Sequence, residues 1–245
     1  MRRSQFSENF LSATTKCRVQ STSRISVKLD NDMCPAEHGL HRLPFVRHGC
    51  RRHSFSAVNE RQLVMVQRLN WGCGLCAAPG WTNSDVTAAP GIDIVRDIRL
   101  GLPVNDAVFD YIVSSHSLPE IPYLDMDLVL GELWRVLKPG GWIRLSLPDM
   151  NRAIQAYLNN DSSYFLIGDD VVRSLAGKMI VQLTWFGRSR LMFTADFMAE
   201  LLARNRYRNI TQVAFRQTVS PFAEITELDN REPESLFIEA SKPAY

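Results

Sequence analysis

The sequence contains no apolar run that approaches the ~20 residues needed to cross a bilayer as a helix. Its apolar stretches end within a few residues at glycine, proline or a charged side chain. It also lacks the G-x-x-x-x-G-K-[ST] motif, whose loop cradles nucleotide phosphates. We therefore expect a globular protein with no membrane span and no P-loop phosphate site.

The five cysteines are too few and too irregularly spaced for a disulfide framework. Cys73 and Cys76 form a C-x-x-C pair, but no second pair lies near them in the sequence to complete a zinc site. The cysteine pattern thus predicts a protein of the reducing cytoplasm that binds no metal.

The net charge of +2 is distributed unevenly along the 245 residues. Residues 1–60 hold ten Lys and Arg against five Asp and Glu, a net charge of +5, whereas residues 61–245 hold eighteen against twenty-one, a net charge of −3. We infer a basic extension over residues 1–60 and one α/β domain over residues 61–245.

The extension shows no lasting period of 2 or 3.6, and its apolar residues occur singly, so we expect it to be largely disordered. Three other hypotheses stay open for it. Its start resembles a transit peptide in composition, its charge would suit nucleic acid, and it holds six cysteines and histidines that could bind zinc. Those six residues are Cys34, His38, His41, His48, Cys50 and His53.

From residue 63 onward, predicted strands and helices follow one another. Short apolar segments bounded by glycine, proline or acids predict strands over 63–71, 81–85, 93–98, 109–115, 142–147, 210–216 and 235–240. Leucines at four- or five-residue steps predict a helix over 124–137, and further helices are predicted over 151–158 and 194–204, capped by Asp149 and Thr194. Breakers at 138–141 should end the first helix. The alternation predicts a mostly parallel sheet with packed helices.

Glycines and acids gather where the predicted strands end. Gly72 and Gly74 follow the first strand, and Asp85 and Asp97 fall at the ends of the second and third. Ligands bind outside the carboxyl ends of such sheets. Glycines let a ligand approach the backbone, one carboxylate suits a ribose diol, and the other suits an adenine amine. This set predicts an adenosine site without a phosphate cradle.

A dinucleotide site is the alternative, because Gly72-x-Gly74-x-x-Ala77 fits the loose pattern G-x-G-x-x-G/A. That pattern expects its ribose-binding acid about 20 residues further on. Asp85 follows Gly74 by only eleven residues, which leaves no room for a full helix between the strands. The spacing disfavours nicotinamide cofactors.

Seven ordered runs in residues 64–241 resemble the class I SAM-dependent methyltransferases (SAM, S-adenosylmethionine), most of all the type 11 subgroup with a short first crossover. The runs are LNWGCG at 69–74, GWTNSD at 80–85, DIR at 97–99, FDYIVSSH at 109–116, RVLKPGG at 135–141, LSLPD at 145–149 and ESLFIEA at 234–240. The resemblance implies a Rossmann-like, seven-stranded sheet with helices on both faces and an antiparallel last strand. It also implies an enzyme that transfers the methyl group of SAM.

The resemblance assigns roles by position. Trp71, Gly72, Cys73 and Gly74 would pass under the methionine part of SAM, and Asp85 would hold the ribose. Asp97 and Ile98 would flank the adenine, while Ser115 and His116 would face the methyl group and the acceptor.

One run departs from the family. Where the family usually has x-Leu-Glu-His-Ile, this chain has Ser117-Leu118-Pro119-Glu120-Ile121. His116, the only histidine of the domain, is the leading candidate for a general base, and Glu120 is the second. The departure also allows a non-catalytic SAM-binding or scaffold protein with a degenerate acceptor site.

Residues 160–193 do not fit the alternation and predict a lid or insert over the acceptor. They carry aromatic residues and arginines that would suit a small, anionic acceptor. These are Tyr164, Phe165, Arg173, Trp185, Phe186, Arg188, Arg190 and Phe193. A saccharide or another secondary metabolite is our expectation. The domain's charge of −3 speaks against nucleic acid, and the oligomeric state stays open.

Overall fold

The computed structural model describes residues 65–245, which form one compact unit. The predictions for residues 1–60, namely disorder, a transit peptide, a zinc site and a nucleic-acid contact, lie outside the described residues. No helix of the described part is long and apolar enough to span a membrane, and no group of three or more metal-binding side chains gathers there.

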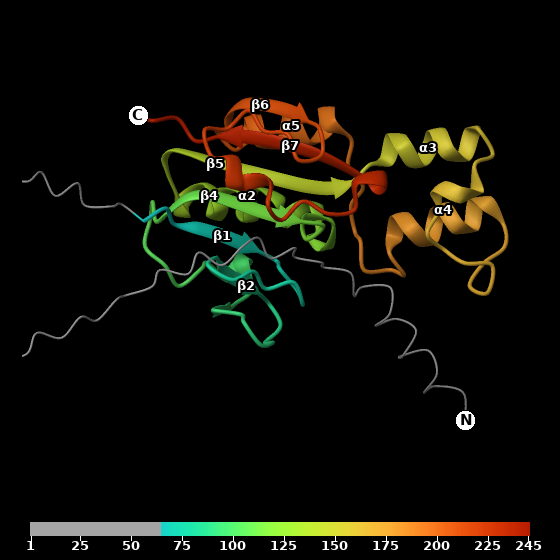
Figure 1. Ribbon diagram of the computed structural model, residues 1–245, viewed down its shortest axis with the longest axis horizontal. Coiled ribbons are helices and arrows are strands. Elements are labelled where there is room, and N and C mark those ends of the chain that lie inside the picture. Colours follow the sequence, from blue (N-terminus) through green and yellow to red (C-terminus); the bar gives the residue numbers. More distant parts are fainter. Residues whose placement is uncertain (1–64) are drawn as a thin grey trace, which may run out of the picture. The chain divides into compact units, whose positions relative to one another are not determined.

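Seven strands form one twisted sheet (Figure 1). Their bounds are β1 Arg68–Trp71, β2 Thr82–Asp85, β3 Ile94–Val95, β4 Phe109–Ser115, β5 Leu137–Pro148, β6 Arg208–Val213 and β7 Ser235–Ser241. The order is β3-β2-β1-β4-β5-β7-β6, and β7 runs antiparallel to both of its neighbours. The predicted seven-stranded, mostly parallel sheet with an antiparallel last strand is confirmed.

Within residues 65–245, four α-helices accompany the sheet: α2 Met126–Val136, α3 Met150–Leu158, α4 Leu175–Thr184 and α5 Ala195–Arg204. Both predicted caps are confirmed. The Asp149 carboxylate accepts hydrogen bonds from two N–H groups at the start of α3, and the Thr194 hydroxyl accepts one at the start of α5.

Helices α2 and α5 cover one face of the sheet. Their inward residues pack with alternate residues of β1, β4, β5 and β7 into the main apolar core. Typical members are Leu69, Ile112, Leu130, Leu133, Ile143, Leu145, Met198 and Leu201. This core fixes the strands whose carboxyl ends carry the predicted site.

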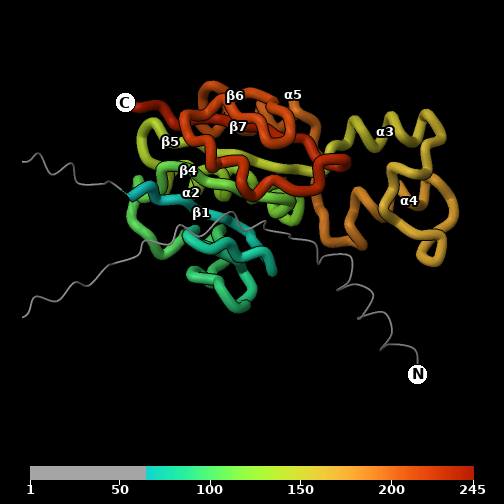
Figure 2. Tube along the Cα trace, viewed as in Figure 1, coloured from blue at the N-terminus to red at the C-terminus, as the bar shows by residue number. Residues whose placement is uncertain are grey.

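The opposite face is covered, within the described residues, by the chain between β6 and β7 (Figure 2). We refer to residues 214–234 as the cover loop. It holds no α-helix, only short 3₁₀ turns such as η5 Ala223–Thr226. Ile225 and Phe222 of this loop pack on Trp81 and Tyr111 of the sheet.

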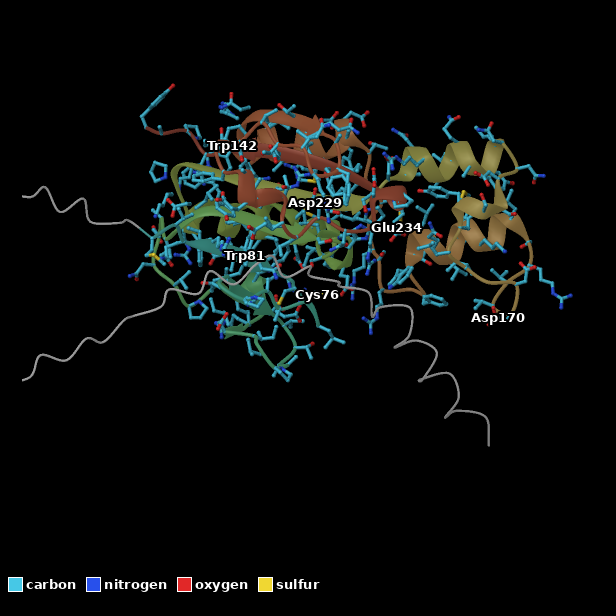
Figure 3. All side chains as sticks on the ribbon, viewed as in Figure 1. Cys76, Trp81, Trp142, Asp170, Asp229 and Glu234 are labelled. Carbon is cyan, nitrogen blue, oxygen red and sulfur yellow. The ribbon has the colours of Figure 1, made fainter. Side chains whose placement is uncertain are left out.

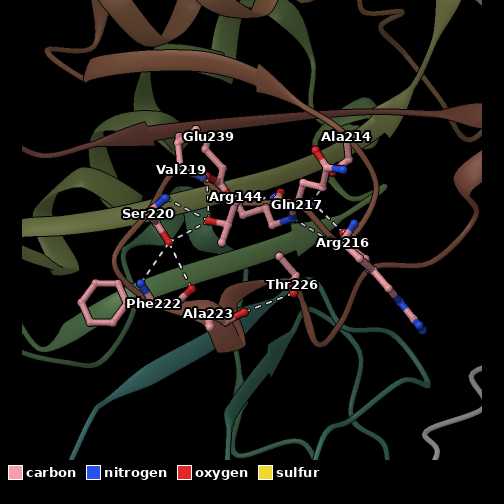
Figure 4. Close-up of polar contacts among 12 residues, drawn as sticks. Arg144, Ala214, Arg216, Gln217, Val219, Ser220, Phe222, Ala223, Thr226 and Glu239 are labelled. Atoms are coloured by element: carbon pink, nitrogen blue, oxygen red, sulfur yellow. Dashed lines mark hydrogen bonds and ion pairs between the residues drawn. The ribbon is translucent and has the colours of Figure 1, made fainter.

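Arg144 of β5 holds the cover loop by a buried ionic network. Its guanidinium, fully buried, binds the Asp229 carboxylate with two hydrogen bonds of 2.7 and 2.6 Å and the Glu239 carboxylate with one of 2.6 Å. It also donates to the carbonyl groups of Ala214 and Gln217, as Figure 4 shows. Ion pairs and hydrogen bonds therefore hold the cover loop on its face of the sheet, whereas apolar packing holds α2 and α5 on the other face.

The first helix ends at Val136, before the predicted breakers at 138–141, but the following strand begins earlier than the predicted residue 142. Strand β5 begins at Leu137 and runs through these residues, because the sheet absorbs them as a bulge. Leu137 pairs with Phe109 and Trp142 pairs with Tyr111, so four residues stand opposite one. Gly140 takes the positive φ of 78° that this requires.

Helices α3 and α4 pack together beyond the strand ends (Figure 1). Their small core contains Ala153, Ala156 and Phe165. The helical appendage therefore begins at α3, ten residues before the predicted insert, and the chain returns to the sheet where Phe193 bridges to Asp149.

Candidate active site

The turn after β1 depends on its two glycines. Gly72 and Gly74 have φ angles of 67° and 54°, the left-handed region that a Cβ disfavours. The N–H of Gly72 donates to the Ser84 carbonyl at 2.7 Å, which fixes the turn against β2. A Cβ on Gly72 would collide with the Ser117 side chain, whose hydroxyl donates to the Gly72 carbonyl at 2.7 Å. Ser117 thus locks the turn from the loop after β4.

Asp85 ends β2 directly beside this turn. Its Oδ2 accepts the N–H of Gly74 at 2.8 Å, and its Oδ1 accepts the N–H of Thr87 at 2.9 Å. A carboxylate offers about four lone-pair sites, so two remain for the hydroxyls of a ribose. A Cβ added at Gly74 would meet no atom within 4 Å, so the space over the turn is open to a ligand. These residues fit an adenosine-bearing cofactor.

Trp71 and Cys73 contribute backbone rather than side chains to the turn, since both side chains are buried. Burial, helped by the nearby Asp85 charge, raises the pKa of the Cys73 thiol to about 12. The thiol therefore stays neutral, which argues against a redox or metal role.

Asp97 caps the 3₁₀ turn η1, Ile98–Leu100, and is bound by Arg99. The guanidinium contacts both carboxylate oxygens, at 3.0 and 2.6 Å, and the Arg99 N–H adds a third bond. The hydrogen bonds from Arg99 hold the pKa of Asp97 below its usual range. The Ile98 side chain lies in the main core. An adenine at this edge would share Asp97 with Arg99 and meet the backbone of Ile98.

His116, directly after β4, has both ring nitrogens engaged. Its Nε2 lies 2.7 Å from the Ser235 hydroxyl, and its Nδ1 lies 3.5 Å from the Arg231 guanidinium. Arginine only donates, so Nδ1 accepts and Nε2 carries the hydrogen. Burial and the Arg231 charge lower the pKa of His116 to about 3. The imidazole is neutral and fixed, which weakens it as a general base.

The rim beside His116 is formed by Leu118–Glu120, a 3₁₀ turn. Glu120 is exposed, and Pro119 is buried with its carbonyl accepting the N–H groups of Arg190 and Leu191 at 2.7 and 3.2 Å. The departure from the family thus lies where the appendage rejoins the domain.

Of the residues predicted to line the acceptor site, some lie near His116 and others lie elsewhere in the fold. Trp185 lies near His116, since the Arg231 guanidinium stands 5.6 Å from its ring centre and also contacts the imidazole. Phe165 lies in the appendage core, Phe193 lies in the main core, and Arg173 is exposed.

Four residues that sequence reasoning did not single out also lie at this edge: Ser117, Asn230, Arg231 and Glu234. Asn230 lies 3.3 Å from the hydroxyl of Ser115, the last residue of β4. Three of the four come from the cover loop. No local sequence pattern indicates that this loop returns to the carboxyl ends of the strands.

Residues 72–145 match the family described as "Methyltransferase domain". No curated protein matches the chain in sequence.

The solved structures similar to this chain include SAM-dependent methyltransferases from Thermotoga maritima and Archaeoglobus fulgidus. They share 16% and 12% identity, with TM-scores of 0.45 and 0.46, over 72% of this chain and 82% and 86% of theirs. Another is phosphoethanolamine N-methyltransferase 2 of Haemonchus contortus, at 15% identity and a TM-score of 0.44, over 73% of this chain. This chain spans only 49% of that protein.

The family match covers the glycine turn, Asp85 and the strands β2, β4 and most of β5. The strands of this segment belong to the seven-stranded sheet of order β3-β2-β1-β4-β5-β7-β6. The family match therefore shows that residues 72–145 of this chain carry a SAM-dependent methyltransferase domain.

Proposed function

We propose that this methyltransferase acts on a small-molecule acceptor in the cytoplasm, for example a saccharide or another secondary metabolite. The hydrogen bond between Gly74 and Asp85 carries the placement of the cofactor, because it sets a carboxylate beside an open backbone turn. In this proposal Trp71–Gly74 support the methionine part and Asp85 binds the ribose. Asp97 and Ile98 flank the adenine, and Ser115 and His116 face the acceptor.

SAM supplies a methyl group on a sulfonium, which is transferred by an in-line displacement. The protein's contribution is then mainly alignment and a dry path. Ser117 holds the turn, and the partly buried His116–Ser235 pair gives the acceptor side a rigid wall. The charge of −3 over residues 61–245 supports a small acceptor over nucleic acid.

The second candidate is a SAM-binding protein without turnover, and the Pro119-Glu120 pair favours it. Replacing the pair by the family's residues, Pro119→Glu with Glu120→His, separates the two functions. A gain of methyl transfer by the double variant would indicate a degenerate site, whereas turnover by the unchanged chain would exclude the scaffold.

Calorimetric titration of the full chain with SAM and with S-adenosylhomocysteine tests the proposal. We expect micromolar binding that Asp85→Ala weakens at least tenfold, because two charge-assisted hydrogen bonds to the ribose are worth about 3 kcal/mol. Asp170→Ala is the matched control, an exposed acid in the appendage away from the glycine turn. No binding by the folded full chain would contradict the proposed function.

A further inference from the structure

Glu234 is a buried carboxylate at the edge of the sheet where the candidate acceptor site lies. It ends the 3₁₀ turn η6, Glu232–Glu234, directly before β7, and its carbonyl accepts the N–H of Asp149 at 2.9 Å. Its side chain is only 10% exposed. Figure 3 shows it where the sheet meets the α3–α4 appendage.

The Glu234 carboxylate accepts no hydrogen bond from any residue in the described part of the chain. Its charged neighbour there is Arg231, whose Nη1 lies 3.7 Å from Oε1, beyond hydrogen-bonding distance. The other two buried carboxylates of this face, Asp229 and Glu239, each accept three hydrogen bonds of 2.6–2.9 Å. Glu234 alone among these three lacks a donor.

The Glu234 oxygens are not among the fully buried atoms without a partner in residues 65–245, so water or a ligand can reach them, but a largely buried carboxylate without a protein donor still calls for an explanation. Burial raises the pKa of Glu234, and Arg231 offsets this only in part. A donor brought by a ligand would complete the site. Acids with a pKa raised by burial are often found at functional sites.

The other candidate bases fit less well. His116 has both nitrogens engaged, and Glu120 is exposed at the rim. Glu234, by contrast, is joined to His116 from two sides. Its neighbour Ser235 bonds the Nε2 of His116, and Arg231 Nη1 lies between the imidazole and the carboxylate.

We propose that the Glu234 carboxylate accepts the proton of the acceptor's hydroxyl group during methyl transfer. This rests on the proposed function, which sets the methyl group over Ser115 and His116. As the oxygen–carbon bond forms, the carbon–sulfur bond breaks with its electron pair going to sulfur, and the hydroxyl proton passes to Glu234. Arg231 balances the charge of Glu234, so the acceptor is a neutral, hydroxyl-bearing compound.

The test needs no acceptor. Sinefungin carries an amine in place of the methylated sulfonium, whereas S-adenosylhomocysteine has a neutral thioether there. A carboxylate facing the methyl position should attract the protonated amine. We expect the full chain to bind sinefungin more tightly than S-adenosylhomocysteine, and Glu234→Gln to reduce that preference about fivefold or more without weakening S-adenosylhomocysteine. Glu232→Gln, an exposed neighbour, should leave it unchanged.

The outcomes are distinct. An unchanged preference in Glu234→Gln, with S-adenosylhomocysteine still bound, overturns the role of Glu234. Failure of the unchanged chain to bind either compound overturns the proposed function itself. If Glu234→Gln does not fold, the unchanged chain still gives an answer. Its preference for sinefungin should decline as the pH falls through the raised pKa of Glu234, and a preference constant down to pH 4 contradicts the proposal.

Discussion

The N–H of Gly74 donates a 2.8 Å hydrogen bond to Oδ2 of Asp85, which ties the turn after β1 to the last residue of β2. No helix separates these two strands, because only ten residues join them. Without a crossover helix, this hydrogen bond fixes the position of the Asp85 carboxylate at the open side of the turn. Substitutions in the turn should therefore affect stability and cofactor binding together.

Gly72→Ala should destabilise the protein more than Gly74→Ala. Both glycines have positive φ, which costs about 1 kcal/mol for alanine. Only at Gly72 does the new Cβ collide with Ser117, and such overpacking costs a further 1–3 kcal/mol, roughly. Urea unfolding of the two variants measures the difference. Equal losses of stability in the two variants would show that the Ser117 side chain can move away from the new Cβ without destabilising the fold.

Ser117→Ala should weaken the binding of S-adenosylhomocysteine several-fold and lower the free energy of unfolding by about 1 kcal/mol. The variant removes the hydroxyl that donates to the Gly72 carbonyl at 2.7 Å and leaves the fold's core intact. Ser163→Ala is the control, because its hydroxyl bonds an exposed carboxylate in the appendage. Calorimetry and thermal unfolding measure both effects. Unchanged affinity would mean that the turn is held by its own backbone bonds.

The long strands were predictable because burial on both faces leaves a continuous apolar run. Strand β4 has the predicted bounds, residues 109–115, for this reason. The start of β5 was not predictable, since the bulge at Lys138–Gly141 arises from pairing with β4 and not from local preference. Strand β3 is shorter than predicted because Asp97 caps a 3₁₀ turn instead of continuing the strand.

The candidate site was predictable where it follows the strand ends. Gly72, Gly74 and Asp85 lie together as the sequence indicated. Ser117 escaped notice because its contact with Gly72 joins residues 45 positions apart. Glu234 escaped notice because a charged residue in a loop is normally solvated, and its burial depends on how the cover loop is anchored.

The lowered pKa of His116 should make the free energy of unfolding decrease as the pH falls. Its pKa is about 3 in the fold and about 6.5 when unfolded, so the unfolded chain binds more protons between these values. Its contribution is complete above pH 6.5, and about 2 kcal/mol of it is lost by pH 5. His116→Asn, which tolerates the positive φ of 56°, should remove this part of the pH dependence. Urea unfolding from pH 7.5 to 5 measures the two dependences of stability on pH, and equal slopes would contradict a neutral, partly buried imidazole.

Arg144→Met should destabilise the protein by about 3–5 kcal/mol and free the cover loop, because it leaves the carboxylates of Asp229 and Glu239 buried without their cation. Limited proteolysis should then cut within residues 214–231, which the unchanged protein protects. Arg204→Met is the control, since its ion pair with Asp127 is exposed and its loss should change little. The same loop carries Arg231 and Glu234 to the site, so Arg144→Met should also abolish the preference for sinefungin while β1 and β2 still bind S-adenosylhomocysteine. Loss of both affinities together would instead mean that the network supports the whole sheet rather than the loop alone.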